Sequence, residues 1–170
     1  MPWNAPCFSE KQRFRQWWLC LLVLIGPVFL IWAIFQQVVM DAPIGNNPTS
    51  DLVLITLGLI FGIGLPGFIF VIRLDTEVSE CGVRIRCWPF HRRWVVFDFE
   101  AIQKAEAITY RPLADYGGWG IRYGRKGKAY NVSGNTGVLL TMKNGKRVLI
   151  GSMDHEALGL RIQQGLVKHP

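Results

Sequence analysis

The sequence predicts an α+β protein in which an N-terminal hairpin of two membrane-spanning helices precedes an antiparallel β domain that ends in one helix. Two uncharged apolar runs, at 17–39 and 52–72, flank a short polar loop. After them the pattern changes to short segments that alternate apolar and polar residues, and residues 155–167 carry one apolar stripe. We therefore expect three parts: a cytoplasmic tail at 1–16, a transmembrane hairpin at 17–72 and a cytoplasmic domain at 73–170.

The two apolar runs are long enough to span a bilayer. They contain 23 and 21 residues, and a helix of about 20 residues spans a hydrocarbon core of about 30 Å. One alternative is a pair of buried core helices, but the polar remainder of the chain is too small to cover them. Another is a cleaved signal peptide, but the first run exceeds the usual signal-peptide core of about 7–15 residues. Gly58 and Gly62 favour packing of the second run against the first, with a dimer face as the alternative.

The distribution of charge predicts the orientation. The chain has a net charge of +7, and the whole excess lies after residue 72. The loop at 40–51 has no lysine or arginine and carries Asp41 and Asp51. The basic residues nearest the spans are Lys11, Arg13 and Arg15 before the first, and Arg73, Arg84 and Arg86 after the second. Because basic residues stay on the cytoplasmic side, we expect a multi-pass protein of the inner membrane with both termini in the cytoplasm.

Seven or eight short strands are predicted in the domain from their alternation and from the turn residues between them. The segments are 74–79, 83–88, 93–99, 103–111, 120–123, 129–132, 138–142 and 147–150. Asn144-Gly145 is typical of a two-residue type I′ turn and joins the last two of them. Asp154 can cap a helix over 155–167, where Leu158, Ile162 and Leu166 form an apolar stripe that would cover the sheet.

Three blocks in this domain carry a resemblance to a known kind of protein. They are Tyr116–Arg122 (YGGWGIR), Ala129–Asn135 (AYNVSGN) and Asn144–Ser152 (NGKRVLIGS). With the preceding hairpin, they make the chain similar to uncharacterised prokaryotic membrane proteins that have a two-helix transmembrane hairpin and a bacterial PH-like domain. The resemblance covers roughly 73–167 and implies a membrane tether and a PH-like antiparallel β-barrel or sandwich with a C-terminal helix. It implies no established activity and no functional residues.

Two basic turns are the candidate functional residues. Arg122, Arg125, Lys126 and Lys128 lie on and around one predicted turn, and Arg92 and Arg93 follow His91 in another. Near a bilayer, a basic residue is attracted to anionic headgroups by about 1 kcal/mol. The alternative is that both are ordinary solvated turns that obey the positive-inside bias. Nucleic acid is not an expected partner, because the sequence has no long basic stripe and carries a membrane tether.

The sequence contains no constellation that predicts catalysis or a cofactor. His91, His155 and His169 are not at metal-ligand spacings, and Cys81 and Cys87 do not form a Cys-x-x-Cys pair. The glycine-rich run at 117–127 lacks the P-loop pattern, so its glycines are interpreted as turn residues. No metal, cofactor or catalytic residue is therefore expected.

These observations predict a non-enzymatic integral membrane protein whose cytoplasmic PH-like module interacts with a protein or with anionic lipid. The hairpin contacts membrane lipids, and the module would bind anionic headgroups or another membrane protein. A structural subunit of a larger membrane complex is the alternative. A membrane-bound enzyme of unknown chemistry is a more remote one.

Overall fold

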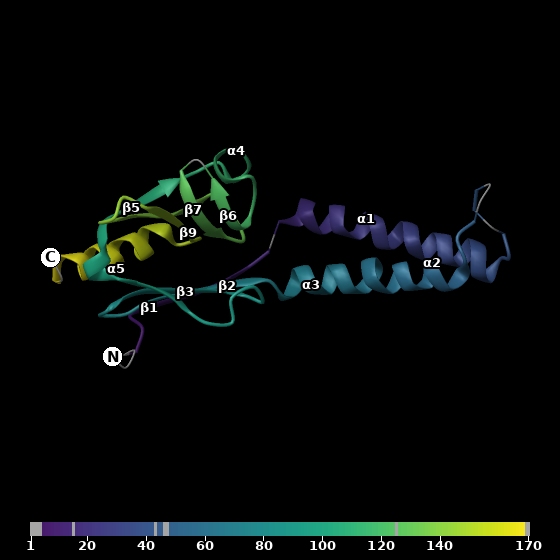
Figure 1. Cartoon of the computed structure of the whole chain (residues 1–170), viewed down its shortest axis with the longest axis horizontal. Helices are drawn as coiled ribbons and strands as arrows, with labels where there is room; N and C mark the ends of the chain where they lie inside the picture. Colours follow the sequence, from purple (N-terminus) through teal and green to yellow (C-terminus); the bar gives the residue numbers. More distant parts are fainter. Residues whose placement is uncertain (1–4, 15, 43, 46–47, 125, 169–170) are drawn as a thin grey trace. The chain divides into compact units, whose positions relative to one another are not determined.

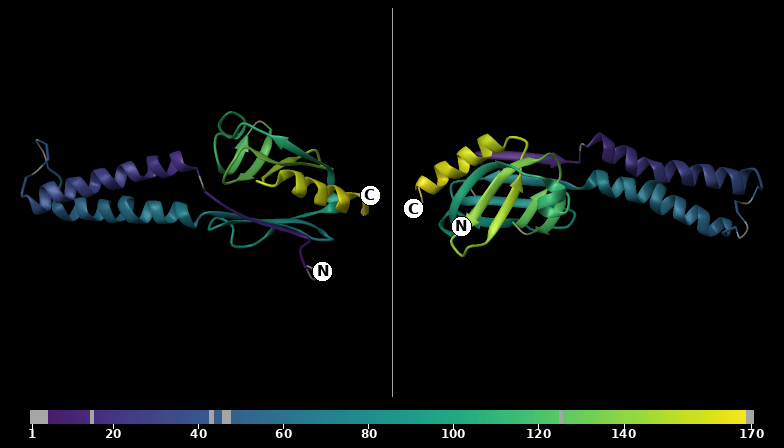
Figure 2. Two further views of the ribbon diagram at one scale, coloured as in Figure 1. Left: turned by 180° about the vertical axis from the view of Figure 1, so that it is seen from behind. Right: turned by 90° about the horizontal axis from the view of Figure 1, so that it is seen from above.

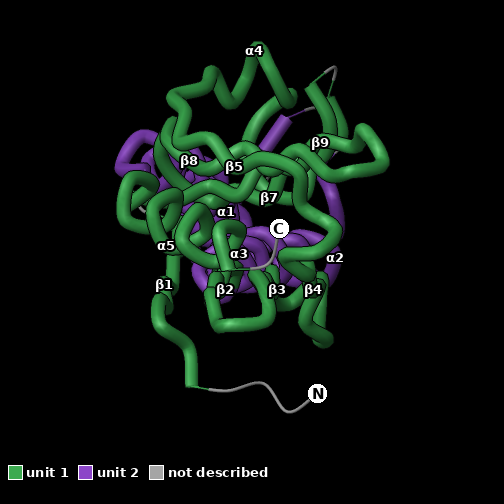
Figure 3. The backbone as a smooth tube through the Cα atoms, turned by 90° about the vertical axis from the view of Figure 1, so that its left-hand side faces the viewer, with its two compact units in different colours: residues 1–14, 72–170 green, residues 15–71 purple. Residues whose placement is uncertain are grey.

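The computed structural model describes residues 5–14, 16–42, 44–45, 48–124 and 126–168. The chain divides into two compact units, coloured separately in Figure 3. Residues 15–71 form the helical unit, and residues 1–14 together with 72–170 form the β unit. The β unit is therefore assembled from two stretches of chain that lie on either side of the helical unit in the sequence.

The helical unit consists of two long apolar helices (Figure 1). The first is α1 (Trp17–Ile34), continued by the π-helical turn η1 (Phe35–Val39), and the second is α2 (Asp51–Leu57), η2 (Gly58–Gly64, π-helical) and α3 (Leu65–Val71). They contain 23 and 21 residues with mean hydropathies of 2.6 and 2.4, which is long and apolar enough to cross a membrane. Their bounds agree within a residue with the predicted spans.

The two helices pack closely at one glycine. A Cβ atom added to Gly58 would lie 2.6 Å from Cδ1 of Ile34, so glycine lets the side chain of Ile34 pack directly on the backbone of η2. Nothing lies within 4 Å of a Cβ added to Gly62. At the loop end, Gln37 Nε2 donates to the carbonyl oxygen of Thr49 (2.6 Å) and to Asp51 Oδ1 (2.7 Å). The first glycine of the motif thus serves the hairpin contact that the sequence predicted.

The β unit contains two sheets and a C-terminal helix, seen from two sides in Figure 2. Sheet A has the order β1 (Phe8–Arg13), β2 (Arg73–Val78), β3 (Gly82–Trp88) and β4 (Val95–Asp98). Sheet B has the order β5 (Ile102–Thr109), β8 (Thr136–Met142), β9 (Arg147–Gly151), β7 (Gly127–Asn131) and β6 (Gly120–Gly124). The helical elements are η3 (Phe99–Ala101), α4 (Pro112–Tyr116) and α5 (His155–Lys168).

All eight predicted segments overlap strands, but the described chain has nine, because the predicted tail contains one more. Phe8–Arg13 pairs antiparallel with β2 along its whole length, with Arg13 opposite Arg73. The buried side chain of Gln12 donates from Nε2 to the carbonyl oxygen of Gly151 in sheet B (2.7 Å). Ile72, assigned to the second span by its hydropathy, is 7% exposed and belongs to the core of the β unit. The tail at 1–16 is thus partly an edge strand of the domain.

Sheet B departs from the antiparallel prediction at one pair of strands. Strands β7 and β9 run parallel, with Lys128 opposite Val148 and Tyr130 opposite Ile150. The β6–β7 hairpin joins the sheet at the edge of β9 that β8 leaves free, and β7 runs in the same direction as β9. This parallel pair brings the start of β7 next to the turn between β8 and β9.

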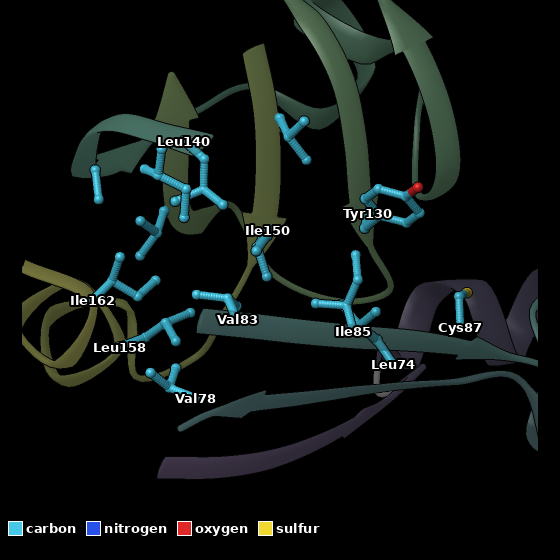
Figure 4. Packing of buried hydrophobic residues seen from close by; sticks show 14 of the residues in the cluster. Leu74, Val78, Val83, Ile85, Cys87, Tyr130, Leu140, Ile150, Leu158 and Ile162 are labelled. Atoms are coloured by element: carbon cyan, nitrogen blue, oxygen red, sulfur yellow. The ribbon is translucent and has the colours of Figure 1, made fainter. Parts of the chain in front are cut away.

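The core lies between the facing sides of the two sheets and α5 (Figure 4). The buried side chains include Leu74, Val78, Val83 and Ile85 from sheet A, Tyr130, Leu140 and Ile150 from sheet B, and Leu158 and Ile162 from α5. Two of the three predicted stripe residues of α5 are therefore fully buried, and Leu166 packs against the same core. Asp154 Oδ1 accepts from the backbone N–H of Ala157 (3.3 Å), as expected of the helix cap.

Candidate anion-binding surface

The turn with Arg92 and Arg93 lies at the end of sheet A from which the chain passes into the helical unit. Strands β1 and β2 both lead there, and the register places Arg13 opposite Arg73 and Arg73 opposite Trp88. We call this end, formed by Arg13, Arg73 and Trp88, the exit end. The connection 89–94 follows Trp88 directly, so the exposed Arg92 and Arg93 lie at the exit end.

The two arginines of strand β3 are paired with carboxylates of strand β2. Arg86 pairs with the buried Asp75 at 2.8 Å, and Arg84 pairs with Glu77. Trp94 lies beneath both guanidinium groups, whose carbon atoms are 4.5 and 4.6 Å from its ring centroid. These arginines form a neutralised layer on the outer face of sheet A. They do not add free positive charge to the exit end.

The basic residues of the β6–β7 hairpin are divided between its two faces. Arg122 donates from Nε to the carbonyl oxygen of Trp119 (2.9 Å) on the side of α4. Lys128 lies on the opposite side, toward the core, with its Nζ 5.0 Å from the ring centroid of Tyr123 and 4.7 Å from that of Tyr130. Arg125 lies outside the described residues. The structure therefore separates Arg122 from Lys128, because neighbouring strand positions face opposite ways.

Lys126, in the hairpin turn, forms an ion pair with α4. Its Nζ is 2.9 Å from Asp115 Oδ1, and Asp115 Oδ2 accepts from the backbone N–H of Arg111 at 3.0 Å. The backbone hydrogen bond from Arg111, with the contribution of Lys126, holds the pKa of Asp115 below its ordinary value. This pair fixes the turn against α4 while leaving the lysine more than half exposed.

His91 connects the two basic turns. Its ring lies 5.8 Å from the ring of Tyr130, on the side of the hairpin that carries Lys128. Burial lowers the pKa of His91, and the positive charge of Lys128 lowers it further. The fold thus brings the 91–93 turn and Lys128 together from two different sheets, which the sequence alone left open.

A third basic turn completes the surface, and it was not among the predicted site residues. Lys146 and Arg147 follow the β8–β9 turn, and the parallel pairing of β7 with β9 places them beside Lys126 and Gly127. An open groove of about 800 Å³ runs between the two turns. We call it the cationic groove; its lining residues are Tyr123, Gly124, Lys126, Gly127, Lys128, Gly145, Lys146, Arg147 and Val148.

The turn that carries Lys146 differs from the predicted type I′ turn. The N–H of Gly145 donates to the carbonyl oxygen of Met142 (2.9 Å), and the N–H of Met142 donates to that of Lys146 (2.8 Å). Gly145 has a φ of +79°, but Asn144 does not have a positive φ. The loop is therefore a three-residue turn with glycine in the left-handed position, and Asn144 Oδ1 accepts from the N–H of Lys146 (3.0 Å).

Two of the three blocks that carry the family resemblance meet in a hydrogen-bond network. The buried Asn131 accepts at Oδ1 from the N–H of Gly120 (3.0 Å) and donates from Nδ2 to the hydroxyl of Tyr110 (3.0 Å). Trp119 donates from Nε1 to the carbonyl oxygen of Gly134 (2.9 Å). Burial raises the pKa of Tyr110 to about 12. These hydrogen bonds hold the loop between β5 and β6 in place beside the β6–β7 hairpin.

The remaining reactive side chains are dispersed. Among the residues that the structure describes, no group of three or more His, Cys, Asp or Glu side chains is arranged to hold a metal ion. The four cysteines are free, and burial raises the pKa of Cys87 to about 11. The surface that stands out chemically is the cationic groove with the neighbouring 91–93 turn.

Comparison with known sequences identifies the family but no activity. No curated protein matches the chain with significant sequence similarity. The model of a family of unknown function (DUF6141) matches residues 2–167, so the chain belongs to that family.

Proposed function

We propose that the protein is a non-enzymatic, membrane-anchored module whose β unit engages the anionic headgroups of the membrane that holds it. The helical unit supports anchoring: its side chains are exposed almost all round, including Trp17 at 74%, Ile25 at 68% and Ile63 at 69%. Only 11% and 0% of the best windows of the two helices are buried, unlike the core helices of soluble proteins. The positive-inside bias favours an inner-membrane protein with a cytoplasmic β unit.

The single observation that carries this proposal is the position of the 91–93 turn. Ile72 alone separates Arg73 from the last residue of α3, and Arg73 is paired with Trp88, which precedes the turn. Chain continuity therefore keeps Arg92 and Arg93 close to the point where the polypeptide enters the apolar helix. Exposed cations held at that point would lie within the reach of headgroup charge, which extends about 10 Å at moderate ionic strength.

The proposal includes a PH-like architecture for the β unit. Two sheets that enclose a core, followed by a C-terminal helix packed on it, agree with that plan. The added strand β1 and the parallel pair β7–β9 are departures from it. In this proposal, strand β1 and the parallel pair β7–β9 adapt the PH-like scaffold to carry the basic surface of this chain.

Hydrogen exchange of the full-length chain in lipid nanodiscs tests the proposal. We expect amides of residues 90–94 to exchange more slowly in discs that contain phosphatidylserine than in discs of phosphatidylcholine alone, and salt to abolish the difference. The turn at 79–82 is the internal control, because it joins β2 and β3 at the opposite end of sheet A. Arg92→Glu with Arg93→Glu should remove the lipid effect. Equal exchange in both lipids would leave a protein partner as the better explanation.

A further inference from the structure

The cationic groove is built by parts of the chain that are distant in sequence and held firmly together. A Cβ atom on Gly127 would overlap the backbone oxygen of Arg147, so the β6–β7 and β8–β9 turns meet in direct backbone contact. Gly127 also has a φ of +114°, which favours glycine. The backbone of sheet B therefore fixes the spacing of the positions that carry the basic side chains. Binding of a ligand then needs to order only the side chains and not the two turns.

Four of the residues that line the groove are cationic and none is acidic: Lys126, Lys128, Lys146 and Arg147. Lys126 has Asp115 as a partner. Within the part of the chain that the structure describes, no carboxylate lies within ion-pair distance of Lys128, Lys146 or Arg147. Gathering like charges around a concave surface raises the positive potential there and attracts multivalent anions. The groove differs in this respect from strands β2 and β3 of sheet A, where Arg73, Arg84 and Arg86 each lie within ion-pair distance of a carboxylate.

Lys128 is the least exposed of the four cations. Its amine lies between the aromatic rings of Tyr123 and Tyr130. Burial acts to lower the pKa of Lys128, but the two tyrosines outweigh it and hold the pKa above its ordinary value. The amine therefore stays charged at neutral pH. Tyr123 is 78% exposed and adds a hydroxyl group at the rim of the groove.

We propose that the cationic groove is a binding site for a compact anion that carries two or more phosphate charges. Lysine ammonium groups bind phosphate as point charges, and arginine can bind two phosphate oxygens at once. The volume of about 800 Å³ suits a ligand of headgroup size. The same chemistry is found in a phosphorylated lipid headgroup and in a soluble polyphosphate. For the lipid source, this inference rests on the proposed function; for the soluble source it stands independently.

Calorimetric titration of the full-length chain with inorganic tripolyphosphate, in phosphatidylcholine nanodiscs, tests the site. We expect saturable 1:1 binding that weakens with salt. Lys146→Glu and Arg147→Glu should each weaken it roughly tenfold or more, the loss typical of one charge-assisted contact. Lys143→Glu is the matched control, because Lys143 is exposed in the same turn but does not line the groove. Equal loss in the control, or no saturable binding, would overturn the proposal, as would preferential binding of polyglutamate.

A second arm identifies the source of the anion. If the groove binds headgroups of its own membrane, phosphatidic acid in the nanodiscs should compete with tripolyphosphate and weaken its apparent binding to the wild type. The residual tripolyphosphate binding of the Arg147→Glu variant should not weaken further when phosphatidic acid is added. If tripolyphosphate binds equally well in both lipids, the ligand is a soluble anion. Arg92→Glu with Arg93→Glu should weaken tripolyphosphate binding much less than Arg147→Glu does, because Arg92 and Arg93 do not line the groove. This variant therefore separates failure of the groove from failure of the bilayer contact at the exit end.

Discussion

Two glycines of α5 should respond in opposite ways to the same substitution. Replacing glycine by alanine inside a helix generally stabilises it by about 1 kcal/mol. A Cβ atom on Gly159 would lie 3.4 Å from Ala107 Cβ and 3.7 Å from Val138 Cγ2, which are ordinary contacts. Gly159→Ala should therefore stabilise the β unit by about 1 kcal/mol, which corresponds to a rise of roughly 5 °C in Tm for a domain of this size.

Gly165 has a different environment on the same helix. A Cβ atom there would overlap the ring of Phe99, which is 2% exposed in the core beneath α5. Overpacking of this kind costs about 1–3 kcal/mol, more than the helix propensity returns. Gly165→Ala should therefore lower the stability by about 1 kcal/mol, so the two variants should differ by about 2 kcal/mol, or roughly 10 °C in Tm.

Thermal unfolding of the full-length chain in detergent, followed by near-ultraviolet circular dichroism, measures both variants under one condition. Phe99→Leu in the Gly165→Ala background should remove the overlap, so the double variant should be more stable than the sum of the single effects predicts. If Gly165→Ala raised the Tm as much as Gly159→Ala does, the packing of the last turn of α5 against Phe99 would be refuted.

Three further predictions follow from the fold and the surface. Replacing residues 15–71 by Asn-Gly should yield a soluble, folded β unit, because Arg13 lies opposite Arg73 and a short turn can join the strands there; circular dichroism and gel filtration check this, and an aggregated product contradicts it. Asn131→Leu should cost about 2–4 kcal/mol, since it leaves the buried hydroxyl of Tyr110 and the half-buried N–H of Gly120 unpaired, whereas Tyr110→Phe should cost about 1 kcal/mol; equal Tm losses would argue against the network. The pKa of His91 in the folded chain is below its ordinary value of 6.5. Between the folded and the unfolded pKa of His91, the unfolded chain therefore binds more protons than the folded chain does. The Tm should fall as the pH drops through 6.5 and should level off below the folded pKa. His91→Gln should flatten that part of the profile; an unchanged profile would assign the effect to another group.

The elements with a strong local pattern were predictable from the sequence. The segments at 83–88 and 138–142 alternate apolar and polar residues, and the stripe of α5 repeats every fourth residue. The secondary structure of these elements is therefore determined by their local sequence. Strand β1 was missed because Phe8 is its only apolar residue and its buried side chain is the polar Gln12. No local pattern marks such a strand, whose place depends on a partner sixty positions away, where Arg13 meets Arg73.

The candidate surface was predictable only in part for the same reason. Basic turns are visible in the sequence, but the groove depends on the parallel pairing of β7 with β9, which is a long-range contact. That pairing brings Lys126 and Lys128 beside Lys146 and Arg147, whereas Arg122, which donates to the carbonyl oxygen of Trp119, does not line the groove. Side chains alternate between the two faces along β6 and β7, so Arg122 and Lys128 can be assigned to opposite faces once the strands are known. Which turns meet across the sheet is determined by topology.

Strand β1 also determines the order in which the protein can be completed during synthesis. It is synthesised before both apolar helices, and its pairing partner β2 follows only after them. Until then the edge that β1 will occupy does not exist, and the N-terminal residues have no sheet to join. The order of the chain therefore places the synthesis of both helices before the pairing of β1 with β2 and the closure of the β unit, so the strand that precedes the helices in the chain docks among the last.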